Sequence, residues 1–570
     1  MTHDPRNAAQ PPPIAAETSP DAGHGRVASG VKASGGARAS SSALVAAGIL
    51  LSRIAGLVRQ RVLATYFGAG LHADVFSAAL RMPNVLQNLL GEGTLSASFI
   101  PVYSELLHQG RLKDAGRVAG AMFALLLAIA GAIALLGLAL APLVVTIFAP
   151  GFAGARRELT IAVVRIIFPM TGVLVLSAWA LGILNSHRKF FLPYFAPVLW
   201  NAAMIAALVG LGGRVDLDRL LMALAWGALL GGVLQLGVQL PWVLKLDRGI
   251  RLNMGRALPE FREAVRNAGP AILGRGVVQL STYVDMILAS LLAVGAVARL
   301  QYAQTLYVLP ISLFGMSVAA AALPELARRR GSAATALREQ TAEAVRRVAL
   351  FIVPSFVALV VLGETFVAGL YEAGEFGAAD VRIVWLTLAA YSLGLFASAS
   401  TRVYQSAFFA LRDTKTPARV AAMRVVVSGA ASALLMLQFE PVTLGSFSIP
   451  AGVFAGASVA GLPLGPVGLA LGAAVGAWLE WGLLRAALAR RVGAVGAGAG
   501  SVARMLAAAL AAAGAGYGFG VVLAGLHPLP RALLVAAVFG TVYFPLARLL
   551  GIAEAGAALA VAAKRLRLRR

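Results

Sequence analysis

Long apolar segments recur from residue 43 almost to the C-terminus, and they constrain the fold of this chain more than any other feature. There are fourteen, and each is long enough to cross about 30 Å of hydrocarbon at about 1.5 Å per residue. Backbone polar groups inside a bilayer must pair within the protein, so each segment is expected to be a helix. The sequence predicts an all-α multi-pass membrane protein. The approximate spans are 43–66, 73–105, 117–148, 159–186, 191–212, 219–245, 262–294, 298–327, 343–370, 382–410, 416–438, 461–488, 501–526 and 531–552.

The composition agrees with a membrane protein and excludes several kinds of chemistry. Hydrophobic residues make up 59% of the chain and charged residues only 13%, whereas soluble domains carry about 25% charged residues. The absence of cysteine excludes disulfides, thiolate metal sites and cysteine nucleophiles. No two of the six histidines have the spacing of metal ligands. We therefore expect neither a metal site nor a catalytic centre.

The net charge of +24 is better explained by membrane topology than by nucleic-acid binding. If the N-terminus is cytoplasmic, basic residues are more frequent in the inner loops than in the outer loops at nearly every connection, as cytoplasmic loops of membrane proteins require. No soluble basic segment is large enough to dock on a duplex, so we expect no nucleic-acid partner. This pattern predicts an even number of spans in the bacterial cytoplasmic membrane, with both termini cytoplasmic.

The chain divides into two tails, two halves and an extra pair of spans. The first tail is rich in Pro, Ala, Gly and Ser and lacks an apolar core, so we expect a disordered cytoplasmic segment and not a signal peptide. Similar stretches, "SRIAGLVRQRVLATYFGAGLHAD" and "GPAILGRGVVQLSTYVD", open the first and seventh spans, which favours two related halves of six spans. The expected units are 1–41 (tail), 42–250 (first half), 251–495 (second half), 496–553 (last two spans) and 554–570 (basic cytoplasmic tail).

The first two predicted spans contain an unusual number of ionisable residues. Such a side chain costs at least about 2.5 kcal/mol at mid-membrane and therefore faces protein or a water-filled cavity. Two interpretations are open: Arg53 pairs with Asp74 or Glu92 to hold two helices together, or the cluster lines a polar cavity. The density of charge favours a cavity, and the planar donors of arginine suit a phosphate ligand. The residues are Arg53, Arg59, Arg61, Asp74, Arg81 and Glu92.

The second span is expected to be bent or interrupted. Pro83 removes one helical hydrogen bond, and Gly91 and Gly93 flank Glu92. Broken helices in transporters expose backbone groups that line a binding site, although a simple proline kink is the alternative.

A second candidate site lies in the later spans. Asp285 is the lone acid deep in the seventh span, where it is suited to bind a coupling cation or a proton. Ser428 and Ser432 are four residues apart on the eleventh span and share one face of a helix. Their alternative role is helix packing.

The longest motif of the chain resembles the opening of the MurJ (MviN) family of lipid II flippases. It reads "SRIAGLVRQRVLATYFGAGLHADVFSAALRMPNVLQNLLGEGTLSASFIPVYSEL". The resemblance extends over residues 43 to 552 in the family's order. Further matching stretches are "LPYFAPVLWNAAMI", "LAWGALLGGVLQLGVQLP", "NAGPAILGRGVVQLS", "LPISLFGMSVAAAALPEL", "AYSLGLFASASTRVYQSAFFALRDTKTP" and "GPVGLALGAAVGAWLEW".

The resemblance implies a fold and a function. The family belongs to the multidrug/oligosaccharidyl-lipid/polysaccharide exporter superfamily, with two six-helix lobes around a central cavity and two last helices that form a groove for a lipid tail. Its members move lipid II, an undecaprenyl-pyrophosphate-linked muropeptide, from the inner to the outer leaflet for peptidoglycan synthesis. Transport proceeds by alternating access coupled to Na⁺, H⁺ or the membrane potential. The implied partners are lipid II, membrane lipids and the cell-wall synthesis machinery, and no cofactor is implied.

The resemblance also assigns residues to the cavity. Arg53 and Arg59 are the candidates for the pyrophosphate, Ser52, Asp74 and Glu92 fall on cavity positions, and Arg81 lies where the family often has a basic residue. Asp285 lies where some relatives place a sodium ligand, with Ser428 and Ser432 at the other ligand positions.

The chain departs from the family in both halves. Gln87 replaces an arginine of the second span, and Gln304 and Thr305 replace an Asp-Arg pair of the eighth. The cationic partner from the second half is therefore missing, and Arg275 and Arg299 are candidate substitutes.

Three other functions compete with a lipid II flippase. Two belong to the same superfamily: a flippase for another lipid-linked oligosaccharide, and a multidrug or cation antiporter, for which acids rather than arginines are expected in the first lobe. The third is a membrane-embedded enzyme such as a polyprenyl-phosphate glycosyltransferase. That chemistry needs clustered acids, whereas the acids here are sparse and spread over several spans.

Overall fold

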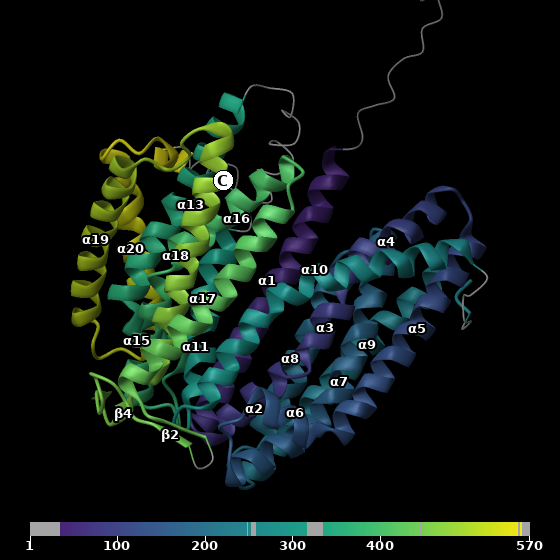
Figure 1. The fold of residues 1–570 in the computed structure, drawn as a ribbon, viewed down its shortest axis with the longest axis horizontal. Coiled ribbons are helices and arrows are strands. Elements are labelled where there is room, and N and C mark those ends of the chain that lie inside the picture. The colour runs from purple at the N-terminus through teal and green to yellow at the C-terminus, as the bar shows by residue number, and fades with distance from the viewer. Residues whose placement is uncertain are drawn as a thin grey trace, which may run out of the picture.

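The computed structural model describes residues 35–247, 249–251, 258–315, 334–444, 447–556 and 559–560, and its long elements are all helices (Figure 1). In chain order they are α1 (Gly35–Phe67), α2 (Leu71–Arg81), α3 (Asn84–Leu90), α4 (Glu92–His108), α5 (Leu112–Ala139), α6 (Ala141–Phe148), α7 (Gly154–Ser186), α8 (Phe191–Leu211), α9 (Leu217–Leu246), α10 (Pro259–Ser290), α11 (Ala296–Pro310), the π-helix η1 (Ile311–Gly315), α13 (Ala334–Val361), α14 (Gly363–Tyr371), α15 (Ala378–Ser392), α16 (Leu395–Ala410), α17 (Lys415–Phe439), α18 (Gly465–Val492), α19 (Ala499–Val522) and α20 (Pro528–Leu549).

Two small antiparallel hairpins lie in the connection between α17 and α18. In the first, β1 (Val442–Leu444) pairs with β2 (Phe447–Ile449), and in the second, β3 (Ser458–Val459) pairs with β4 (Leu462–Pro463).

Within the described residues, nine helices are long and apolar enough to cross a membrane, and the pair α15–α16, bent by 40°, makes a tenth. The other four expected spans are not among these ten. The span 43–66 lies within the single helix α1 and most of 262–294 lies in α10, and side chains of both helices fall outside the described part. The segment 73–105 is broken into α2, α3 and α4, and 298–327 continues past η1 into residues outside the described part.

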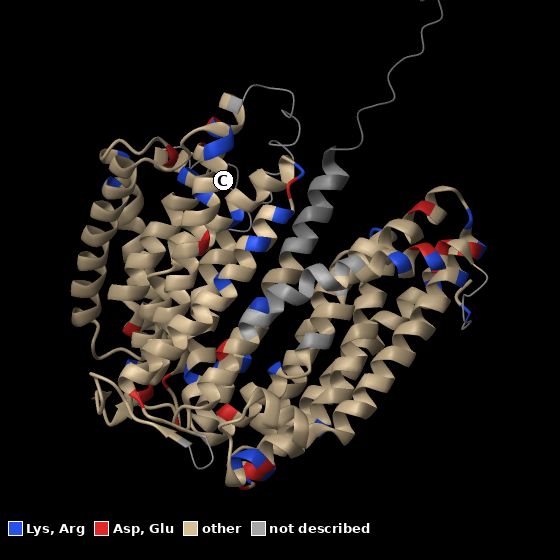
Figure 2. Ribbon diagram, in the orientation of Figure 1, with Lys and Arg blue, Asp and Glu red and all other residues tan. Residues whose placement is uncertain are grey.

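The helices form two groups, with α1 and α10 between them (Figure 1). One group contains α2 to α9 and the other contains α11 and α13 to α20. The groups meet where α2 lies and diverge toward the start of α1. Lys and Arg gather mainly near the ends of the helices, whereas the helix bodies are largely uncharged (Figure 2). The few charges inside the bodies are therefore the exceptions that need an explanation.

The structure confirms that the second expected span is interrupted. Pro83 is the residue before α3, and Gly91 separates α3 from α4. A Cβ atom at Gly91 would collide with the carbonyl oxygen of Gln87, so the break requires glycine. The alternative of one helix with a simple proline kink is therefore wrong. Of the expected flanking residues, Gly93 lies in the first turn of α4 and Glu92 begins that helix, but the side chain of Glu92 lies outside the described part.

Small residues bring α17 and α18 into close contact. A Cβ atom at Gly476 would lie 2.6 Å from the Cβ of Ser428, and one at Gly472 would overlap Ser432. Apolar burial does not drive association between helices in lipid, and close backbone approach supplies dispersion contacts instead. The two serines are thus buried at a helix crossing, as the packing alternative predicted.

We expect Gly472→Ala to destabilise the protein, because its methyl group overlaps Ser432 in α17. Overpacking of this kind costs about 1–3 kcal/mol, which a lower melting temperature of the purified protein in detergent would reveal. Gly482→Ala is the matched control on the same helix, since a Cβ atom there has no neighbour within 4 Å. Equal melting temperatures for the two variants would contradict the packing described here.

Candidate functional site

Arg53 reaches from α1 to the second group of helices. Its Nη1 donates to the Ser312 hydroxyl of η1 at 2.6 Å, and that hydroxyl donates in turn to the Leu309 carbonyl at 3.0 Å. Arg53 and the preceding Ser52 are both half-buried. Among the residues that the structure describes, the guanidinium is thus held by a neutral partner and not by a carboxylate.

Arg59 is placed against an aromatic face. Its guanidinium carbon lies 5.1 Å from the centre of the Trp200 ring of α8, whose indole nitrogen donates to the Ala228 carbonyl at 3.1 Å. The Nε of Arg59 is buried and has no hydrogen-bond partner among the described residues. A buried charged donor without an acceptor is costly, so this site is electrostatically suited to an anion.

Arg61 serves a different purpose from the other two arginines of α1. Its Nη1 donates to the carbonyl oxygens of Gly369 at 2.8 Å and Leu370 at 3.1 Å, near the C-terminal end of α14. Unpaired carbonyls at a helix C-terminus favour a cation. Arg61 therefore joins α1 to α14.

Asp74 is fully buried in a closed set of donors. Its carboxylate pairs with Arg156 of α7 at 2.5 Å and accepts the backbone N–H groups of Gly295 at 2.6 Å and Ala298 at 2.7 Å, which lie at the start of α11. We call Asp74, Arg156, Gly295 and Ala298 the α1–α2 seal, because Asp74 lies in the first turn of α2, directly after the connection from α1. The cavity position expected for Asp74 is not the one the structure gives it, because every donor that faces it belongs to the protein.

Further contacts at the same end strengthen the seal. The Tyr302 hydroxyl donates to the Gly68 carbonyl at 2.9 Å, and the Glu375 backbone N–H donates to the Thr65 carbonyl at 2.9 Å. Arg299 is also located here, 5% exposed and 3.9 Å from Asp380. Arg299 therefore does not replace the missing cation in a cavity.

Arg81 connects the two groups of helices through neutral side chains. Its Nε donates to Gln301 at 2.8 Å and its Nη2 donates to Gln304 at 2.5 Å, both on α11. Gln304 then donates to the Tyr391 hydroxyl of α15 at 2.8 Å. Gln304, at a position where the resemblance implies a charged residue, is thus an acceptor for Arg81. Its neighbour Thr305 donates to the Gln301 carbonyl of its own helix.

Comparison with known proteins identifies the family. The profile described as "Lipid II flippase MurJ" matches residues 63–455, well over half of the chain. The chain belongs to the MurJ family. It is 35% identical over 394 residues to the probable lipid II flippase MurJ of Rhizobium tropici, covering 67% of this chain and 73% of that protein. It is 34% identical over 386 residues to the lipid II flippase MurJ of Burkholderia cenocepacia, covering 66% of this chain and 74% of that protein.

Solved structures show the same fold. A lipid II flippase MurJ in an inward closed conformation aligns with a TM-score of 0.68 and 22% identity, covering 88% of this chain and 99% of that chain. An inward-facing multidrug MATE transporter of the MOP superfamily aligns with a TM-score of 0.57 and 19% identity, covering 77% of this chain and 94% of that chain. Membership of the MurJ family, rather than the shared fold, makes the chain a multi-pass transporter of the bacterial inner membrane and not an enzyme.

The sodium site expected in some MurJ relatives does not fit the residues present here. The charges of Arg81 and Arg424 act on the Asp285 carboxylate, and the Ser432 hydroxyl already donates to the Leu469 carbonyl at 3.0 Å. Ser428 and Ser432 are packed against glycines of α18. Among the described residues, no group of three or more His, Asp or Glu is placed to hold a metal ion. The positive charges of Arg81 and Arg424, which act on Asp285, oppose a cation there, so no transport step is assigned to sodium.

Sequence reasoning missed a polar cluster in the second half. Arg424 of α17 pairs with the buried Glu480 of α18 at 2.6 Å, and Gln405 of α16 donates to the same carboxylate at 3.0 Å. Arg402 of α16 is close enough to interact electrostatically with Arg424 and Glu480. The signal was a mid-span charge on each helix, but nothing in the sequence indicates that the three helices meet. The other candidate substitute, Arg275, has its side chain outside the described part.

The family motif "RDTKTP" has a structural role at the connection of α16 and α17. Asp413 accepts the Thr416 hydroxyl at 2.6 Å and its backbone N–H at 2.9 Å, and it pairs with Arg491 at 2.5 Å. These donors, the Thr416 hydroxyl above all, lower the pKa of Asp413 to about 2. The carboxylate stays charged and caps α17.

We expect Arg156→Gln to open the α1–α2 seal, because it leaves the buried Asp74 without its cation. Breaking a buried pair costs about 3–5 kcal/mol. The chain has no cysteine, so Ala69→Cys supplies a single reporter at a position that is 2% exposed. Its reaction with a soluble maleimide should accelerate at least about tenfold in Arg156→Gln, since each 1.4 kcal/mol is tenfold.

Arg157→Gln is the matched control for this experiment. Arg157 is the adjacent residue on α7, and it donates to the Thr146 hydroxyl at 3.3 Å without contacting the seal. When Ala69→Cys is combined with Arg157→Gln, the cysteine should react with the maleimide at the same rate as in the protein that carries Ala69→Cys alone. If the maleimide reaction accelerates equally in both variants, or accelerates in neither variant, Asp74 does not close this end.

Proposed function

We propose that this protein is a lipid II flippase that moves the undecaprenyl-pyrophosphate-linked peptidoglycan precursor from the inner to the outer leaflet of the cytoplasmic membrane. The observation that carries the proposal is Arg59, a guanidinium that rests on Trp200 and keeps a buried donor without an acceptor. Membership of the MurJ family supports the choice of cargo.

The proposed topology has fourteen spans with both termini in the cytoplasm. The first lobe comprises residues 42–250, the second lobe comprises 251–495, and residues 496–553 form the last two spans. In this orientation the α1–α2 seal closes the outer side, and the lobes diverge toward the cytoplasm. The inner leaflet is then the side from which the cargo enters.

Arg53 and Arg59 are proposed to bind the pyrophosphate. They are six residues apart on α1, which separates them by about 9 Å along the axis and about 120° around it. Their partners, the Ser312 hydroxyl and the Trp200 ring, are both neutral. An entering phosphate therefore gains charge-assisted hydrogen bonds without first displacing a carboxylate. Ser52 and Glu92 are retained as neighbouring candidates, and Arg81 as a residue that senses the approach of the lobes.

Release on the outer side requires the α1–α2 seal to open while the inner side closes. Cargo drives this change only if it binds the outward state more tightly than the inward state, or if another force acts on it. The inside-negative membrane potential provides such a force, because it favours outward movement of an anion by about 2.3 kcal/mol per charge per 100 mV. We propose coupling to the membrane potential, with a contribution from H⁺ as the alternative.

The lipid tail is proposed to stay in the bilayer, along a groove formed by α19 and α20. These two helices pack against each other and against α13 and α14 at the edge of the second lobe (Figure 1). The proposed partners are lipid II, membrane lipids and the cell-wall synthesis machinery that uses lipid II on the outer side.

We expect Arg53→Ala and Arg59→Ala each to abolish rescue of a bacterium depleted of its own flippase. The reason is that each variant loses charge-assisted hydrogen bonds to the pyrophosphate. Lipid II accessible at the outer leaflet should fall to the level of the depleted strain, at unchanged protein abundance. Arg219→Ala is the control, since the Arg219 side chain is 79% exposed and pairs only locally with Asp216.

Two results would contradict the proposal. Full rescue by both arginine variants would show that Arg53 and Arg59 do not bind the pyrophosphate. Efflux of toxic cations without lipid II movement would favour a multidrug antiporter.

A further inference from the structure

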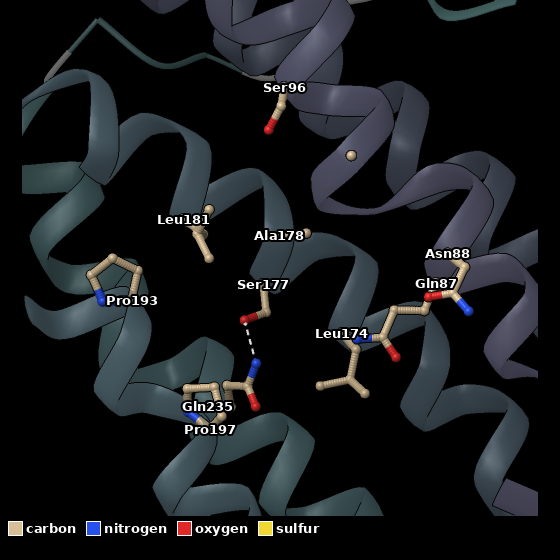
Figure 3. Close-up of a pocket in the computed structure, with 11 residues that line it drawn as sticks. Gln87, Asn88, Ser96, Leu174, Ser177, Ala178, Leu181, Pro193, Pro197 and Gln235 are labelled. Atoms are coloured by element: carbon tan, nitrogen blue, oxygen red, sulfur yellow. Dashed lines mark hydrogen bonds between the residues drawn. The ribbon is translucent and has the colours of Figure 1, made fainter. Parts of the chain in front are cut away.

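A neutral pocket lies inside the first lobe, between α3, α4, α7, α8 and α9 (Figure 3). Its volume of about 410 Å³ is within the range of about 300–1,000 Å³ that is typical of small-molecule sites. None of its eleven lining residues is charged and none is aromatic. Its polar side chains are Gln87, Asn88, Ser96, Ser177 and Gln235.

The polar groups of this pocket have hydrogen-bonding capacity to spare. The Ser177 hydroxyl oxygen accepts Gln235 Nε2 at 3.0 Å and Gln239 Nε2 at 2.7 Å, which leaves the hydroxyl proton available for donation. Gln239 does not line the pocket itself, but it is 1% exposed and its amide holds the Ser177 hydroxyl in place from behind.

The interrupted second span contributes residues from both sides of its break to the same pocket. Gln87 and Asn88 of α3 and Gly93 and Ser96 of α4 line it. Figure 3 shows Gln87 and Ser96 on the side of α3 and α4, with Ser177 and Gln235 on the other side. The pocket therefore presents amides and hydroxyls around one space.

This chemistry selects one part of the proposed cargo. A pocket without cations does not neutralise the negative charge of a pyrophosphate. A pocket without any charged side chain does not neutralise the charged ends of a peptide. Sugar hydroxyls and acetamido groups are neutral donors and acceptors, as are the side chains of the pocket. We propose that this pocket binds an acetamido sugar of the lipid-linked head group.

The pocket and the arginine proposed to hold the pyrophosphate both contact α8. Pro197 of α8 lines the pocket, and Trp200, on which Arg59 rests, is three residues further along the same helix. Residues three apart are neighbours on a helix surface. One head group therefore spans both sites, with its phosphates at Arg59 and its sugar between α4 and α7. This inference rests on the proposed function and adds a specificity site to it.

The test compares binding of two probes to the purified full-length protein. Lipid II carries the sugars, and undecaprenyl pyrophosphate lacks them. Gln87→Leu removes an amide, and Ser96→Leu removes a hydroxyl and fills part of the space. Each variant should weaken lipid II binding about threefold to tenfold, as expected for the loss of one neutral hydrogen bond, and should leave undecaprenyl pyrophosphate binding unchanged. Unchanged binding of the second probe also shows that the variant is folded.

Ala97→Leu is the matched control, because Ala97 is the exposed residue next to Ser96 and does not line the pocket. Both probes should bind it as they bind the unsubstituted protein. Equal weakening of both probes in the pocket variants, or no weakening of either, would overturn the sugar site. Absence of lipid II binding to the unsubstituted protein would instead overturn the proposed function, so the two failures are distinguishable.

Discussion

A charge buried in a membrane must have a protein partner or reach water, and this constraint organises the molecule. Arg61 donates to backbone carbonyls and the Asp74 carboxylate pairs with Arg156, and these contacts hold the lobes together at one end. Among the described residues, Arg53 and Arg59 contact neutral partners, and the buried Nε of Arg59, like that of Arg156, has no acceptor. The same residue type therefore joins helices at one end of α1 and is proposed to bind the cargo further along it.

Much of the fold was predictable because its signals are local. The expected span 191–212 is α8, Phe191–Leu211, and the break near Pro83 and Gly91 follows from the backbone chemistry of proline and glycine. The α1–α2 seal was not predictable, because Asp74 and Ala298 are separated by 224 positions in the sequence. Arg156 has the sequence context of a loop charge, and only the fold brings it to Asp74.

The candidate site was predictable in part for the same reason. Mid-span arginines are rare enough to be noticed, so Arg53 and Arg59 were found from the sequence. The pocket between α4 and α7 was not, because its glutamines and serines are ordinary residues in spans until several helices bring them together. The lone acid Asp285 suggested a cation or proton site and the resemblance suggested sodium, whereas the charges of Arg81 and Arg424 that act on Asp285 argue against sodium here. A resemblance transfers positions, whereas the chemistry at each position must be judged from its neighbours.

The most direct test of the account is a structure of the full-length protein with lipid II bound. The pyrophosphate is expected to lie within hydrogen-bonding distance of the guanidinium groups of both Arg53 and Arg59, with the lipid tail outside the lobes. Phosphates bound elsewhere, with these two side chains still occupied by Ser312 and Trp200, would contradict it.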